Sequence, residues 1–108
     1  MQSYKEAYKY VKNSLGMREK LLGKNHREVA RSYVNLGAIL LQLKDRNGAM
    51  THWTEAVKIF GSIGDTNLED GDRELLARAL NNMATIKESL GDCNGALTFY
   101  RKALDIKL

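Results

Sequence analysis

A nine-residue stretch decides the fold of this chain, and residues 45–53 spell it as DRNGAMTHW. Residues 92–100 repeat it as DCNGALTFY, in which Asp, Asn, Gly, Ala and Thr are unchanged and Tyr100 replaces Trp53. The copies are 47 residues apart, and the same offset pairs Arg31 with Arg78, Asn35 with Asn82, Ala56 with Ala103, and Val57 with Leu104. A fixed period of this length is typical of repeat architectures, so the chain is expected to stack similar units.

A third and fainter copy precedes these two. It lies 42 residues before the first copy, and its spacing matches Ala7, Val11, Ser14 and Leu15 to Ala49, Trp53, Ala56 and Val57. The chain therefore contains parts of three units. We expect one domain over residues 1–108, with the second helix of an incomplete repeat in 1–24 and full repeats in 25–64 and 65–108.

The composition favours one small soluble domain. The chain has 108 residues, of which 44% are hydrophobic and 28% charged, and it contains no Pro, the residue that breaks helices most strongly. No apolar run is long enough to span a membrane, and no signal-peptide core follows Met1. The single Cys93 cannot form an internal disulfide. These features predict a cytoplasmic protein.

The net charge of +4 is concentrated at the start of the chain. Residues 1–24 carry six basic and two acidic side chains, whereas residues 25–108 carry eleven of each. A basic segment can bind nucleic acid or acidic lipid. Here the lysines alternate with apolar residues that the core needs, and Glu6 and Glu19 interrupt them. We interpret them as a solvated helix face and expect no nucleic-acid or membrane partner.

Apolar residues recur at helical spacing along the whole chain, which predicts five helices and an all-α fold. The expected helices are 2–22, 27–44, a third that starts after Asp45 and ends near Gly61 or Gly64, 73–90, and a fifth from Asp92 to the end of the chain. Asp45 and Asp92 are expected to cap their helices, and the spacing places Leu22, Leu90 and Leu104 on buried stripes. Residues 64–72 form the longest and most acidic connection.

At this point the sequence resembles the tetratricopeptide repeat family. The resemblance rests on small and bulky residues at fixed places in each helical hairpin: Tyr33, Leu36, Gly37, Leu40, Ala49, Trp53 and Ala56 in one unit, and Leu80, Met83, Ala84, Gly91, Ala96, Tyr100 and Ala103 in the next. The spacing of 42 residues and the segment 21–30 are similar to the long repeats of kinesin light chains. The segment 89–92 is similar to repeats of spindle-orienting G-protein-signalling scaffolds.

The sequence departs from the family pattern at three points. Lys44 stands where Gly91 stands in the next unit, Lys87 replaces the apolar Leu40, and the usual closing Pro is missing from both repeats. Lys87 is expected to lay its stem on the core and its ammonium in water. None of these changes alters the expected fold.

The resemblance implies a right-handed α-solenoid of antiparallel hairpins, whose first helices line a concave groove that binds segments of other proteins. The groove register holds a polar stripe in each repeat: Arg31, Asn35, Ala38 and Gln42 in the first, and Arg78, Asn82, Thr85 and Ser89 in the second. Asn can donate to and accept from a peptide backbone, and the Arg fork suits a carboxylate. We expect these eight residues to bind a peptide, with the two arginines favouring an acidic segment.

A second reading stays open, in which the chain is a self-assembling homo-oligomer. A short stack leaves apolar surface at both ends, and copies could join by stacking or exchanging helices. The polar stripe would then be an ordinary exposed helix face.

Catalytic and metal-binding patterns are missing from the sequence. His26 is expected to start a helix, and His52 is expected on the outer side of another, neither with a second ligand at metal spacing. The acidic connection has its Gly at the seventh position, where a calcium loop has it at the sixth, and no Glu closes the loop. Trp53 and Tyr100 are expected to pack in the core rather than to hold a ligand. We therefore predict no enzyme, no cofactor and no metal.

Overall fold

The computed structural model describes residues 3–106, apart from the side chain of Asp65. In chain order the helices are α1 (Tyr4–Leu22), α2 (Arg27–Gln42), α3 (Arg46–Ile63), the 3-10 turn η1 (Asp65–Asn67), α4 (Asp70–Ser89) and α5 (Cys93–Leu104). Within residues 3–106 there is no strand. The all-α prediction is thus confirmed.

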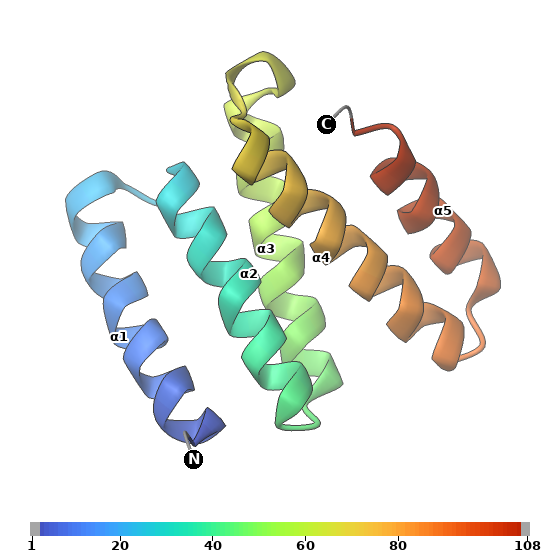
Figure 1. The fold of residues 1–108 in the computed structure, drawn as a ribbon, viewed down its shortest axis with the longest axis horizontal. Helices are drawn as coiled ribbons and strands as arrows, with labels where there is room; N and C mark the ends of the chain where they lie inside the picture. The colour runs from blue at the N-terminus through green and yellow to red at the C-terminus, as the bar shows by residue number, and fades with distance from the viewer. Residues whose placement is uncertain (1–2, 107–108) are drawn as a thin grey trace.

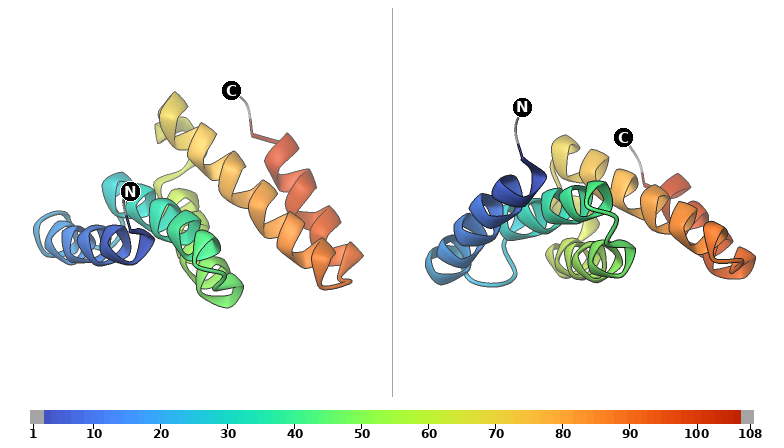
Figure 2. Two further views of the ribbon diagram at one scale, coloured as in Figure 1. Left: turned by 60° about the horizontal axis from the view of Figure 1, so that its bottom comes forward. Right: turned by 90° about the horizontal axis from the view of Figure 1, so that it is seen from below.

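Each α-helix runs antiparallel to the one before it, so the chain winds up and down as a row of hairpins (Figure 1). The tightest pairs are α2 with α3 and α4 with α5, while α1 packs on α2. Seen from below, α2 lies above α3 (Figure 2). The repeat that the sequence showed is therefore a repeat of helical hairpins.

The repeated stretch starts each second helix in the same way. Asp45 accepts a hydrogen bond from the backbone N–H of Gly48, and Asp92 accepts one from Gly95, both at 2.9 Å. Each carboxylate satisfies a free donor of the first helical turn. His26 caps α2, since its Nδ1 accepts from the backbone N–H of Glu28 at 3.1 Å. All three predicted helix starts are confirmed.

Trp53 lies at the centre of the core and is fully buried. Its indole Nε1 donates to the backbone carbonyl of Val34 at 3.1 Å, so its one polar atom is satisfied. Gly37 makes room for the ring, because a Cβ at this position would overlap the indole. The close approach of α2 and α3 therefore requires a residue without a side chain on α2.

The structure corrects the start of one helix and the burial predicted for three leucines. Helix α4 starts at Asp70 rather than at Arg73, since the acidic connection supplies its first turn. Leu22, Leu90 and Leu104 are exposed, although the helical spacing placed them on buried stripes. They lie at the C-terminal ends of α1, α4 and α5, where much of each side chain stays in contact with solvent.

Lys44 makes the same turn as Gly91 in spite of its side chain. Its φ is 69° and that of Gly91 is 84°, so both adopt the left-handed conformation. The hydrogen bonds also correspond: the N–H of Asp45 donates to Leu40 and that of Asp92 to Lys87, both at 2.9 Å. An L residue other than Gly is strained in this conformation.

This strain predicts that Lys44→Gly stabilises the protein. Relief of the left-handed conformation is expected to raise the free energy of unfolding by about 1 kcal/mol. Urea unfolding followed by circular dichroism measures the change. The reciprocal variant Gly91→Lys is the matched control and should lower stability by a similar amount. Equal midpoints for the wild type and both variants would show that the turn carries no strain.

Candidate functional site

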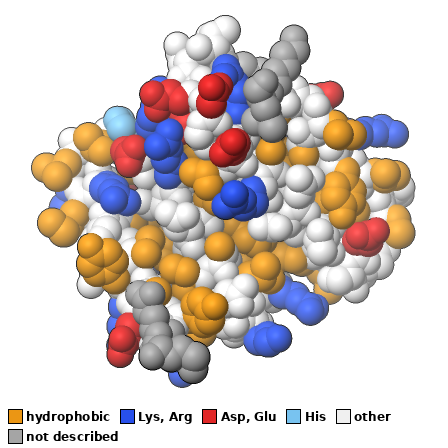
Figure 3. Space-filling view, in the orientation of Figure 1, with side chains coloured by type: hydrophobic (Ala, Val, Ile, Leu, Met, Phe, Trp, Pro, Cys, Tyr) orange, Lys and Arg blue, Asp and Glu red, His pale blue; other side chains and the backbone are white. Residues whose placement is uncertain are grey.

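Helices α2 and α4 lie close together where they begin and move apart toward their C-terminal ends (Figure 1). These are the helices on which the sequence placed the two polar stripes. In the same orientation, acidic and basic side chains gather where α2 and α4 begin. Below them, apolar and uncharged side chains predominate, with some basic ones among them (Figure 3). We call the surface between α2 and α4 the candidate groove. It is charged at its narrow end, where the two helices begin, and less charged at its wide end, where they separate.

The four predicted peptide-binding positions on α2 differ in how exposed they are and in whether they already have partners within the chain. Asn35, Ala38 and Gln42 are exposed. Arg31 is half-buried and is already held by carboxylates of its own chain. Of the polar side chains in this stripe, Asn35 and Gln42 thus make no hydrogen bond within the described part of the chain.

The four positions on α4 also differ. Arg78 is exposed and Asn82 is half-buried, and neither has a hydrogen-bonding partner among residues 3–106. Thr85 donates to the backbone carbonyl of Asn81 at 3.0 Å and lies 3.4 Å from the hydroxyl of Tyr100. Ser89 donates to the carbonyl of Ile86 at 2.7 Å. These two hydroxyls keep only acceptor capacity for a ligand.

The structure reveals an ionic network at the narrow end that the sequence reasoning missed. Arg31 Nε donates to Asp72 Oδ1 at 2.7 Å, and Arg27 Nη1 lies 3.3 Å from Asp72 Oδ2. Both guanidinium groups also contact Glu69 Oε1, at 2.6 Å from Arg27 and 3.2 Å from Arg31. The network ties the start of α2 to the start of α4 and so joins the two repeats.

Asp72 is the inner member of this network, with no exposed surface. In addition to its contacts with the two guanidinium groups, it accepts a hydrogen bond from the backbone N–H of Glu69 at 3.0 Å. The hydrogen bond with Asp72 is the main cause that raises the pKa of Arg31, burial opposes it, and the nearby carboxylates add to it. The acidic composition of residues 64–72 was the available signal. The spacing of the sequence could not show that Arg31, 38 residues before Glu69 and 41 before Asp72, and Arg27 are its partners.

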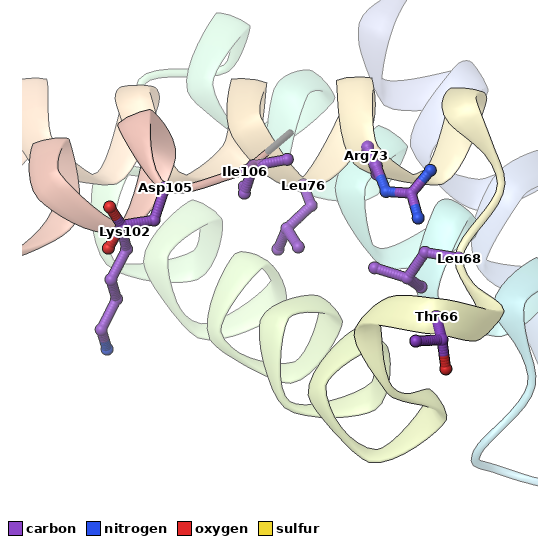
Figure 4. Close-up of a pocket in the computed structure, with 7 residues that line it drawn as sticks. All are labelled: Thr66, Leu68, Arg73, Leu76, Lys102, Asp105 and Ile106. Carbon is purple, nitrogen blue, oxygen red and sulfur yellow. The ribbon is translucent and has the colours of Figure 1, made fainter. Parts of the chain in front are cut away.

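A cleft of about 430 Å³ lies between η1, the first turns of α4 and the end of α5 (Figure 4). Leu68, Leu76 and Ile106 supply apolar side chains, and the charged groups of Arg73, Lys102 and Asp105 also line it. Its lining lacks all eight predicted residues. This cleft is therefore separate from the candidate groove.

A second cleft, of about 320 Å³, is lined by residues of α1, α2 and α3 and includes Tyr33. Burial raises the pKa of the Tyr33 phenol, and the carboxylates of Glu19 and Glu55 add to this effect. His52 is half-buried beside Tyr33 and Tyr8, with ring centroids at 5.7 and 6.5 Å. The prediction that His52 lies on the outer side of its helix was wrong, because α1 and α2 contribute rings that cover it.

Two further features of the described residues bear on function. Over residues 3–106, no group of three His, Cys, Asp or Glu side chains is arranged to hold a metal ion. None of the described helices combines the length and apolar character needed to cross a membrane.

Comparison with known families agrees with this geometry. The tetratricopeptide repeat models match residues 1–62 and residues 76–107. The chain belongs to the tetratricopeptide repeat family. Such repeats generally mediate protein–protein interaction as non-catalytic scaffolds, and the resemblance drawn from the repeated stretch is confirmed. No curated protein matches the sequence.

Proposed function

We propose that this tetratricopeptide repeat protein is a cytoplasmic, non-catalytic scaffold that binds an extended peptide segment of a partner protein between α2 and α4. The observation that carries the proposal is the availability of Asn35 and Asn82. They occupy equivalent positions in the two repeats, and neither amide is used within the described chain. An unused amide offers a donor and an acceptor, which is what a peptide backbone requires.

The remaining stripe residues fit the same role. Ala38 leaves space for a ligand beside exposed Gln42, and Arg78 presents a guanidinium to solvent. Arg78 would favour a carboxylate on the bound segment. The stripe from Arg31 to Gln42 covers about three turns on one face of α2. The contacts of Arg31 with Asp72 place it beside α4.

The experiment compares peptide binding to the wild type and to the double variant Asn35→Ala/Asn82→Ala. Peptides selected by display against the wild-type protein serve as probes, and fluorescence anisotropy measures Kd. Loss of two amide contacts should weaken binding about tenfold, since each net hydrogen bond contributes about 0.5–1.5 kcal/mol. Helicity by circular dichroism should stay the same.

Asn47→Ala/Asn94→Ala is the matched control. These two asparagines are also equivalent in the repeats and exposed, but they lie at the starts of α3 and α5. The control should bind as the wild type does. Equal affinity of the Asn35/Asn82 variant and the wild type would refute groove binding.

A second candidate function is assembly of several copies, which the exposed apolar side chains favour. Tyr10, Met17 and Leu21 follow helical spacing on the outer side of α1, and Leu97 and Leu104 do so on α5. Apolar surface at both edges could join copies end to end. Light scattering across a concentration series distinguishes the candidates, since a monomer at every concentration argues against assembly.

A further inference from the structure

We propose that Arg27 and Arg31 form an acid-binding subsite at the narrow end of the groove, and that Glu69 occupies it as an internal competitor. The inference rests on the proposed groove function and names a regulation of the same site. The competing ligand is an acidic segment of a partner protein, whose carboxylate would replace that of Glu69.

The first support is the convergence of two guanidinium groups on one oxygen. Arg27 Nη1 lies 2.6 Å and Arg31 Nη2 3.2 Å from Glu69 Oε1. These side chains come from successive turns of α2, while Glu69 immediately precedes α4. Guanidinium forks bind carboxylates with good geometry, so the two arginines form a receptor for this group.

The second support is the difference in exposure between the two acidic residues. Asp72 has no exposed surface, whereas the side chain of Glu69 is 63% exposed. An ion pair in contact with water contributes little net stability, because solvation of the separated charges nearly balances it. Glu69 also forms a capping box with Asp72 at the start of α4. Because its ion pairs reach water, another carboxylate can replace it at a smaller cost than it could replace Asp72.

The third support is that the arginines stay in place without Glu69. Asp72 holds Arg31 through Nε at 2.7 Å and Arg27 through Nη1 at 3.3 Å. Arg27 Nη2 also donates to the backbone carbonyl of Asn67 at 2.8 Å. A subsite whose side chains are already ordered binds its ligand with a smaller entropic cost.

Charge explains why Glu69 would inhibit. With Glu69 in place, the two guanidinium charges face Asp72 and Glu69, and Glu28 lies 3.7 Å from Arg31 as well. An approaching acidic segment then meets a site whose net charge is zero or negative. Without the Glu69 carboxylate, the balance shifts by one unit toward positive and the arginine donors become available.

The test measures binding of a fluorescein-labelled hexaglutamate peptide to the wild type and to Glu69→Gln. The variant keeps the size of the side chain and leaves Asp72 in place. We expect it to bind the peptide about fivefold more tightly than the wild type at low salt, since it removes one exposed ion-pair competitor. The gain should shrink as salt is raised, and a hexaglutamine peptide should show no gain.

Glu74→Gln is the matched control, because it removes an equal charge from an exposed position of α4 outside the network. It should bind hexaglutamate as the wild type does. An equal gain in both variants, or binding by Glu69→Gln no tighter than that of the wild type, would overturn the inference. The groove proposal would survive that result, because it depends on the separate Asn35/Asn82 comparison with selected peptides.

Discussion

The Gly37→Ala variant is expected to lose about 3 kcal/mol or more of its free energy of unfolding, because the added methyl group overlaps a buried ring. The Cβ would lie 2.6 Å from Cε2 of Trp53 and closer still to Nε1. The indole is fully buried and donates to the Val34 carbonyl at 3.1 Å, so it cannot move without losing that bond. Urea unfolding followed by tryptophan fluorescence measures the loss.

Two controls separate this clash from the general effect of Ala in a helix. Gly61→Ala adds the same methyl group to α3 where no atom lies within 4 Å, and it should stabilise by about 0.5–1 kcal/mol. The double variant Gly37→Ala/Trp53→Tyr has the residue pair that the second repeat has in Ala84 and Tyr100, and it should regain part of the lost stability. Its unfolding is followed by circular dichroism, because the variant contains no Trp. A Gly37→Ala protein as stable as Gly61→Ala would contradict the proposed packing.

The second large effect is expected from removing both arginines of the ionic network. In Arg27→Met/Arg31→Met, Asp72 keeps its buried position but loses both guanidinium partners. An uncompensated buried carboxylate should lower the free energy of unfolding by about 3–5 kcal/mol. Urea unfolding at neutral pH measures this value.

The controls here test whether the buried charge is the cause. Adding Asp72→Asn to the double variant removes the charge and should recover part of the stability. Arg46→Met removes an arginine from an exposed position at the start of α3 and should change stability by less than about 0.5 kcal/mol. If the double variant loses no more than Arg46→Met does, Asp72 must reach water and the network is not a junction between repeats.

The fold could be predicted from the sequence because its signals are local. The caps at Asp45 and Asp92 act within three residues, and the helical spacing of apolar residues needs only one helix. The repeated stretch in residues 45–53 and 92–100 then showed that the two hairpins have the same structure. Burial at helix ends was predicted less well, as exposed Leu90 and Leu104 show, since it depends on whether another helix covers them.

The candidate site was predicted only in part. Asn35, Gln42, Arg78 and Asn82 are available as the spacing suggested, and their binding role stays a prediction. Arg31 has the same spacing as Arg78, but the structure pairs it with Asp72, 41 residues later. Spacing shows which residues share a helix face, and it cannot show which of them meet a charge from another repeat.

By itself, the sequence determined the repeated hairpins and their caps, because hydrogen bonds and apolar periods within a few residues specify them. It also showed that Gly37 and Trp53 of one repeat are equivalent to Ala84 and Tyr100 of the next. Only the tertiary structure decided that Glu69 and Asp72 form ion pairs with Arg27 and Arg31, and that Lys44 adopts a left-handed conformation. The physical reason is that ion pairs across a repeat junction depend on how α2 and α4 pack. Packing brings together residues whose separation along the chain carries no periodic signal.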